Sequence, residues 1–141
     1  MFAANDRNSL RQRYVETWRR RRAGLPLEPV DAQIADVIEL HPEYQKLLES
    51  EDSVQEQFGV EEGRTNPFLH MGLHLALREQ LGTDRPAGIR AIHAKLAARR
   101  GNRHDAEHTM IEALAETLWE AQRAGRAPDE LAYLERLKRL R

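Results

Sequence analysis

The chain has 141 residues, of which 40% are hydrophobic and 32% charged, and it carries a formal net charge of −1. This length fits a single domain spanning 1–141 that buries its own core. No apolar run approaches the roughly 20 residues of a membrane-spanning helix, and the segment 1–13 lacks the apolar core of a signal peptide, so we expect a cytoplasmic protein with no membrane partner. The near-neutral charge argues against a nucleic-acid partner, and the absence of cysteine excludes disulfides and thiolate ligands.

Helical periodicity runs through almost the whole sequence, whereas strand-like alternation is absent, so we predict an all-α fold, a compact bundle of five to six helices. The predicted helices, in chain order, span about 6–22, 30–40, 66–81, 86–101, 102–125 and 128 onward. Pro42 disfavours helical geometry at His41, so a break is predicted there, followed by a further helical piece at 43–49. The acidic, turn-rich segment 50–65 is predicted to be a loop.

Two of the predicted helices begin with clear capping signals. Asn66 is a good N-cap residue, and Pro67 suits the first helical position that follows it. Asn102 is in the corresponding place before the longest predicted helix. Because apolar residues of that helix recur at helical spacing, Trp119 is predicted to be one of its core positions.

Two histidine pairs at helical spacing are the most informative pattern in the chain. His70 and His74 belong to the predicted helix 66–81, and His104 and His108 to the longest predicted helix. Residues i and i+4 of a helix lie on one face, so each pair aims two imidazoles at one point. Apolar residues share both faces, which predicts that the pairs face the core. Four of the six histidines in the chain are arranged in this way.

The connections between helices determine whether the two pairs meet. Short connections make neighbouring helices antiparallel, so two reversals leave helices 66–81 and 102–125 parallel. Both helices then begin at the same end of the bundle, and the four imidazoles are predicted to converge. Glu107, on the second of these faces, and His41, beside the predicted break, are further predicted ligands, whereas His93 is expected to lie outside the cluster.

Imidazole nitrogens suit zinc, iron, copper and nickel, and a carboxylate ligand widens the choice. The pattern therefore predicts a divalent transition-metal site, with zinc or iron as the cofactor. No nucleotide cofactor is expected, because the sequence has no glycine-rich phosphate loop. The alternative is a non-enzymatic protein-interaction module in which the histidines form a structural polar network without metal. No catalytic residue is predicted.

Three blocks of basic residues lie near predicted helix ends, at 19–22, 99–103 and 138–141. Cations near a helix C-terminus complement the helix dipole, which accounts for these blocks without any ligand. The alternative is a surface for an anionic partner, with weak nucleic-acid binding at 19–22. If the protein is an interaction module, the basic helix ends and the acidic segment 51–62 are the predicted sites for a protein partner.

The run from Asn66 to His74 resembles the hallmark segment of a bacterial family known as domain of unknown function 1841. The resemblance spans nearly the whole chain, and it is also carried by the segments 41–44, 85–90, 104–108 and 118–123. In the family pattern a histidine often follows the tyrosine of segment 41–44, whereas this chain has Gln45 and therefore no imidazole at that position. The resemblance implies a small, mainly proteobacterial, cytosolic protein and implies no particular activity.

Overall fold

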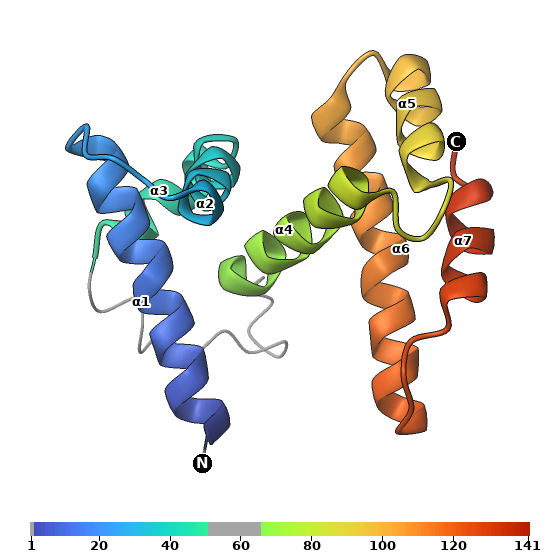
Figure 1. The fold of residues 1–141 in the computed structure, drawn as a ribbon, viewed down its shortest axis with the longest axis horizontal. Helices are drawn as coiled ribbons and strands as arrows, with labels where there is room; N and C mark the ends of the chain where they lie inside the picture. Colours follow the sequence, from blue (N-terminus) through green and yellow to red (C-terminus); the bar gives the residue numbers. More distant parts are fainter. Residues whose placement is uncertain (1, 51–65) are drawn as a thin grey trace. The chain divides into compact units, whose positions relative to one another are not determined.

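The computed structural model describes residues 2–50 and 66–141, with side chains from residue 9 onward. Within these ranges the chain forms seven α-helices and no strand, which confirms the all-α class. The helices are α1 (Phe2–Arg22), α2 (Pro29–Glu39), α3 (Pro42–Leu48), α4 (Pro67–Thr83), α5 (Ile89–Arg100), α6 (Arg103–Ala124) and α7 (Glu130–Lys138) (Figure 1). Residues 51–65 lie outside the described ranges. The predicted partner site 51–62 and all of the predicted loop 50–65 except Ser50 are therefore not described. In the described ranges, no helix has both the length and the apolar character needed to cross a bilayer.

The predicted count of five to six helices is too low, because α3 is a separate helix. The backbone of His41 is not helical, with φ −128° and ψ 73°, and Pro42 occupies the first turn of α3. The proline ring disfavours helical geometry at the residue before it, so the predicted break at His41 is confirmed. The start of α5 also differs from the prediction: the helix begins at Ile89, because Gly88 before it takes a left-handed φ of 98°.

The chain divides into two compact units, Met1–Gly72 and Leu73–Arg141, which we call unit 1 and unit 2. Helices α1, α2 and α3 belong to unit 1, and α5, α6 and α7 belong to unit 2. Helix α4 begins in unit 1 and continues in unit 2. Each unit contains buried apolar side chains of its own. The single domain spanning 1–141 stays a prediction.

In unit 1, α1 packs against α2 and α3. The packed faces bury side chains at helical spacing, which are Tyr14, Trp18, Ile34, Val37, Ile38 and Leu48. Burial of apolar area, at about 25 cal/mol per Å², is the main force that holds helices of this length in place. The ring of Tyr14 also stacks on Phe68, with ring centroids 5.9 Å apart, so the first turn of α4 is packed into unit 1.

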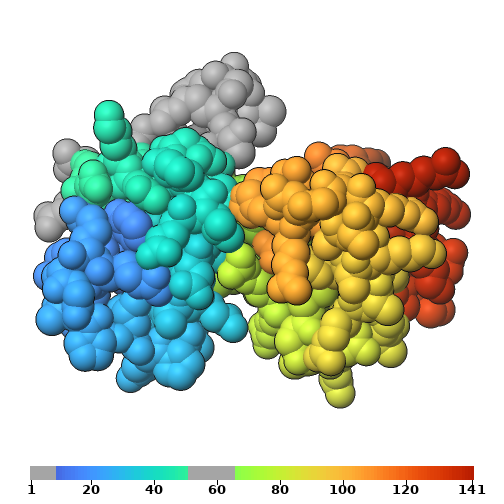
Figure 2. Space-filling view, turned by 90° about the horizontal axis from the view of Figure 1, so that it is seen from above, coloured from blue at the N-terminus to red at the C-terminus, as the bar shows by residue number. Residues whose placement is uncertain are grey.

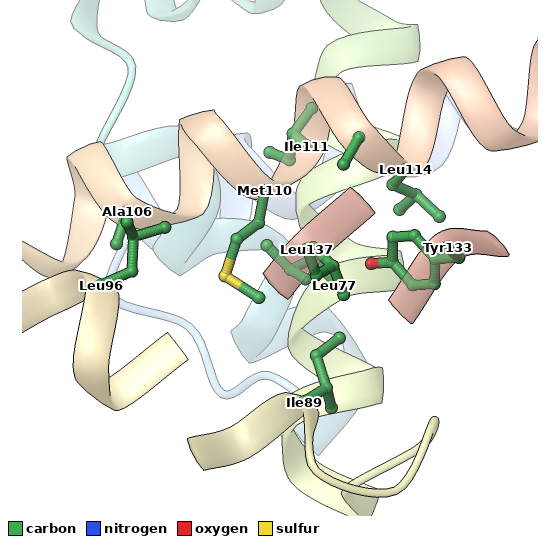
Figure 3. Close-up of a cluster of buried hydrophobic side chains, with 10 residues drawn as sticks. Leu77, Ile89, Leu96, Ala106, Met110, Ile111, Leu114, Tyr133 and Leu137 are labelled. Carbon is green, nitrogen blue, oxygen red and sulfur yellow. The ribbon is translucent and has the colours of Figure 1, made fainter. Parts of the chain in front are cut away.

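In unit 2, α5 and α7 lie on the same side of α6, α5 beside its first half and α7 beside its second half (Figure 1). In the space-filling view the yellow atoms of α5 lie directly against the orange first turns of α6 (Figure 2). The core between these helices comprises Leu77, Ile89, Leu96, Ala106, Met110, Ile111, Ala113, Leu114, Tyr133 and Leu137 (Figure 3). Leu77 is the contribution of α4, so this core fixes α4 against α6 next to the predicted histidine positions.

Helices α4 and α6 are not parallel, which corrects the prediction made from their connections. In Figures 1 and 3 α4 crosses α6 steeply instead of running alongside it. A short connection limits the distance between consecutive helix ends, whereas the packing of side-chain ridges into grooves sets the crossing angle. Leu77 of α4 and Met110 of α6, both fully buried, belong to the core at this crossing. A crossing still brings a turn of each helix together, and that is sufficient to build a site.

Candidate metal centre

Three histidines of unit 2 form one cluster, His74 from α4 and His104 and His108 from α6. Each ring offers one nitrogen as a ligand atom, and these nitrogens lie within 4.8 Å of one another. The ring centroids are 5.4 Å apart for His74 and His104, 4.8 Å for His74 and His108, and 4.1 Å for His104 and His108. His74 is fully buried, and the other two rings are half-buried. The structure therefore brings together three of the four paired histidines in one unit.

Capping fixes the first turns of the two helices that carry these rings. The Oδ1 atom of Asn102 accepts a hydrogen bond of 2.8 Å from the backbone N–H of His104, at the start of α6. A capped first turn places His104 and His108 one above the other on the same face. The Oδ1 atom of Asn66 likewise accepts hydrogen bonds of 3.0 and 3.3 Å from two N–H groups in the first turn of α4. Both capping predictions are confirmed.

Glu107 contacts the cluster at the Nδ1 side of His74. Its Oε2 atom lies 3.3 Å from Nδ1 of His74 and 3.5 Å from Nη2 of Arg78. Burial raises the pKa of the Glu107 carboxyl, whereas the contact with His74 and the charge of Arg78 lower it, and the net effect is a pKa below its usual value. A charged carboxylate beside Nδ1 favours the tautomer with the proton on that nitrogen, in which Nε2 of His74 presents the lone pair.

This arrangement gives Glu107 the position of a residue that orients a ligand. Within the described residues of unit 2, the clustered atoms that could bind a metal all belong to histidines. Glu107 is not one of them, and it contacts Nδ1 of the His74 ring. Its predicted role as a direct ligand stays a prediction. Arg78, which contacts the same carboxylate, was missed by the sequence analysis. The available signal was its spacing, because Arg78 follows His74 by one helical turn and shares its face.

His41 and His70 belong to unit 1, where they pack against Tyr44. The ring of Tyr44 stacks on His41 with centroids 5.3 Å apart, and His70 meets His41 edge-on at 5.1 Å. Nδ1 of the fully buried His41 lies 2.7 Å from the carbonyl oxygen of Val37. Because a carbonyl only accepts, Nδ1 carries the proton and Nε2 has the lone pair in the neutral ring. This tautomer suits a metal ligand, and the roles of His41 and His70 as ligands stay predictions.

The donor set of unit 2 defines the chemistry that the cluster supports. Three imidazoles supply three of the four nitrogen, oxygen or sulfur ligands that zinc usually takes, and a fourth comes from water or another side chain. Metal-binding histidines usually have a carboxylate or carbonyl at their second nitrogen, which is the position of Glu107 beside His74. His93 lies on α5 and is not a member of the group, as expected.

Comparison with known proteins places the chain in a family. No curated protein and no solved structure matches it. The family described as "Domain of unknown function (DUF1841)" matches residues 6–139, nearly the whole sequence. This match includes all six predicted ligand positions and both capping residues. The chain therefore belongs to the DUF1841 family, as the resemblance in the run from Asn66 to His74 implied.

Proposed function

We propose that this protein binds one divalent transition-metal ion through His74, His104 and His108. The observation that carries the proposal is the convergence of three ring nitrogens, from two helices far apart in sequence, to within 4.8 Å of one another. A bound ion would have its ligands at about 2.0–2.1 Å, so small side-chain rotations suffice to close the cluster around it. The ion would then join α4 to α6 at their crossing.

Zinc is the metal that the ligand set favours. Imidazole suits zinc, copper, iron and nickel, whereas the common non-haem iron site needs two histidines and one carboxylate. The carboxylate nearest to the cluster, that of Glu107, contacts Nδ1 of His74 and the guanidinium of Arg78. These two contacts favour a role for Glu107 in orienting His74 over direct binding of the metal. Without a carboxylate ligand, iron is less favoured than zinc.

Metal analysis of protein purified without a histidine tag tests the proposal. We expect about one equivalent of zinc after growth in supplemented medium, and less than about a tenth of an equivalent in His104→Ala, because two imidazoles bind zinc poorly. His93→Ala is the matched control, since His93 is a half-buried histidine of the same unit outside the group, and it should keep the wild-type content. Wild-type protein without any transition metal would contradict the proposal.

The same measurement on His41→Ala and His70→Ala tests the two predicted ligands of unit 1. A loss of zinc in either variant would add that residue to the ligand set. Retention of a full equivalent in both would limit the protein ligands to the three histidines of unit 2. In either case the result for His104→Ala decides the proposal itself.

Replacing Glu107 by glutamine is expected to weaken zinc binding by about 10- to 100-fold while the histidines remain in place. The amide keeps the size of the side chain but removes the negative charge beside Nδ1 of His74. Competition with a zinc-sensitive dye measures the change in affinity. Glu112→Gln is the control, because Glu112 is exposed on the same helix, and its affinity should equal that of the wild type. Equal affinities for all three proteins would remove Glu107 from the centre.

A further inference from the structure

The three basic blocks of the sequence have different surroundings in the structure. Each arginine of the block 19–22, at the end of α1, has an acceptor within unit 1. The contacts are Arg19 with Glu16, Arg20 with the carbonyl oxygen of Pro26, Arg21 with Asp36 and Glu39, and Arg22 with Glu49. Acceptor groups of unit 1 therefore offset most of the positive charge of the block 19–22, which was predicted as a nucleic-acid site. Little positive potential remains there to attract an anionic partner.

The other two blocks meet in unit 2, where the end of α5 packs against α7. A guanidinium nitrogen of Arg100 donates a 2.6 Å hydrogen bond to the main-chain oxygen of Arg141, which joins the two helix ends. A surface hollow of about 660 Å³ beside them is lined by Arg99, Lys138, Arg139, Leu140 and Arg141. A neighbouring hollow of about 220 Å³ shares three of these residues and adds Lys95. We call the five cations of the two hollows the α5–α7 basic surface.

The positive charge of the α5–α7 basic surface exceeds the negative charge around it. Within the described part of the chain, no aspartate or glutamate side chain lines either hollow. The C-terminal ends of α5 and α7 together present about one negative charge, roughly half a charge each, against five cations. Lys138 has one ion pair, at 3.8 Å to Glu135, which offsets one of the five positive charges, as Glu49 does for Arg22. The surface therefore keeps a strong local positive potential in a chain with a net charge of −1.

We propose that the α5–α7 basic surface binds the phosphate backbone of nucleic acid. Guanidinium groups match phosphate oxygens in a bidentate manner, and three of the five cations are arginines. Neither hollow is lined by an aromatic ring among the described residues, so bases are not stacked and their sequence is not read. The proposal is independent of the metal centre, because none of the three clustered histidines lines these hollows.

The layout of the cations favours an extended polyanion over other anions. All five side chains are exposed and spread over two adjoining hollows, whereas a small phosphate site needs several donors converging on one point. An acidic peptide would gain most from an apolar anchor pocket. Of the apolar residues that line the smaller hollow, Leu96 and Leu137 are only 2% and 1% exposed and Ile92 and Leu140 are half-buried, so the apolar surface open to such an anchor is small.

Fluorescence anisotropy with a labelled 12-nucleotide oligo(U) RNA and a labelled 16-base-pair DNA duplex tests the proposal. We expect binding at 50 mM salt that weakens as salt rises, with a log–log slope of about −2 to −3.5 for the single strand. Arg99→Gln/Arg139→Gln should weaken binding at least about tenfold and make the single-strand slope less steep by about 1.4. The matched control is Arg19→Gln/Arg22→Gln, which changes the net charge equally but in unit 1, and it should bind like the wild type.

Three outcomes would overturn the proposal. The first is that neither nucleic acid binds at 50 mM salt. The second is an equal loss of affinity in both double variants, which would make binding a property of overall charge. The third is equally effective competition by poly-glutamate of the same charge, which would identify a surface for acidic protein. Circular dichroism melts of the variants verify that they fold. Metal content, measured on the same samples, tests the metal proposal separately, so either proposal can fail without the other.

Discussion

Treatment with EDTA, which would remove the proposed metal ion, is expected to lower the melting temperature of the protein by about 10–15 °C. An ion that binds the folded chain and not the unfolded chain adds about 4 kcal/mol when its free concentration is a thousandfold above Kd. The effect should be this large because the ion would hold α4 and α6 together beside the core of unit 2. Thermal melts followed by circular dichroism, with and without EDTA and with zinc restored, measure it.

The chelator result has an internal control in His104→Ala. This variant should melt near the temperature of the EDTA-treated wild type, and EDTA should not lower it further, since the variant holds no ion. His93→Ala should respond to EDTA as the wild type does, because its ring is outside the group. A wild-type melting temperature that EDTA leaves unchanged would favour the alternative, in which the three imidazoles form a polar network without metal.

Leu77→Ala is expected to destabilise unit 2 by about 3–5 kcal/mol. Leu77 is fully buried, and it is the α4 residue of the core cluster that includes Met110 and Leu114 of α6. Truncation removes apolar contacts and leaves a cavity that the surrounding helices fill only in part. Urea unfolding of zinc-free protein measures the loss without a contribution from the ion.

The exposed side chain of Leu131 provides the control for this cavity. Leu131 is 76% exposed on α7, so Leu131→Ala should change the free energy of unfolding by less than about 0.5 kcal/mol. If Leu77→Ala were equally mild, the crossing of α4 and α6 would not depend on the core that the structure shows. Zinc affinity should also fall in Leu77→Ala, because Leu77 lies on α4 one turn after His74.

Local signals in the sequence predicted where two helices begin, where the chain breaks at His41 and which histidines share a face. Asn66 and Asn102 identify two helix starts because a capping side chain acts on N–H groups two or three residues away, within reach of pattern analysis. His104 and His108 share a face for the same local reason. The break at His41 follows from the ring of the next residue alone.

Properties that depend on tertiary packing were not predictable in this way. The crossing of α4 and α6 depends on which side chains interlock, and helix spacing contains no information about that choice. Trp119, predicted to be buried, is 55% exposed, and the guanidinium of Arg123 lies 4.7 Å from the centre of its ring. Helical periodicity identifies an apolar stripe but does not show how far the neighbouring helices extend over it. The contact of Glu107 on α6 with Arg78 on α4 likewise joins two helices, so no pattern within either helix predicts it.

The positions of the clustered histidines along the chain have a consequence for how the folded chain is held together. An ion held by His74 and His104 closes a loop from residue 74 to residue 104, which contains the whole of α5. Such a closure resembles a disulfide in joining two segments that are distant in sequence, but the unfolded chain does not hold the ion, so the stabilisation comes from binding to the folded chain. Unlike a disulfide, it needs no oxidising surroundings and opens reversibly with the supply of metal. In a sequence with no cysteine, the added stability would therefore rise and fall with the concentration of free metal.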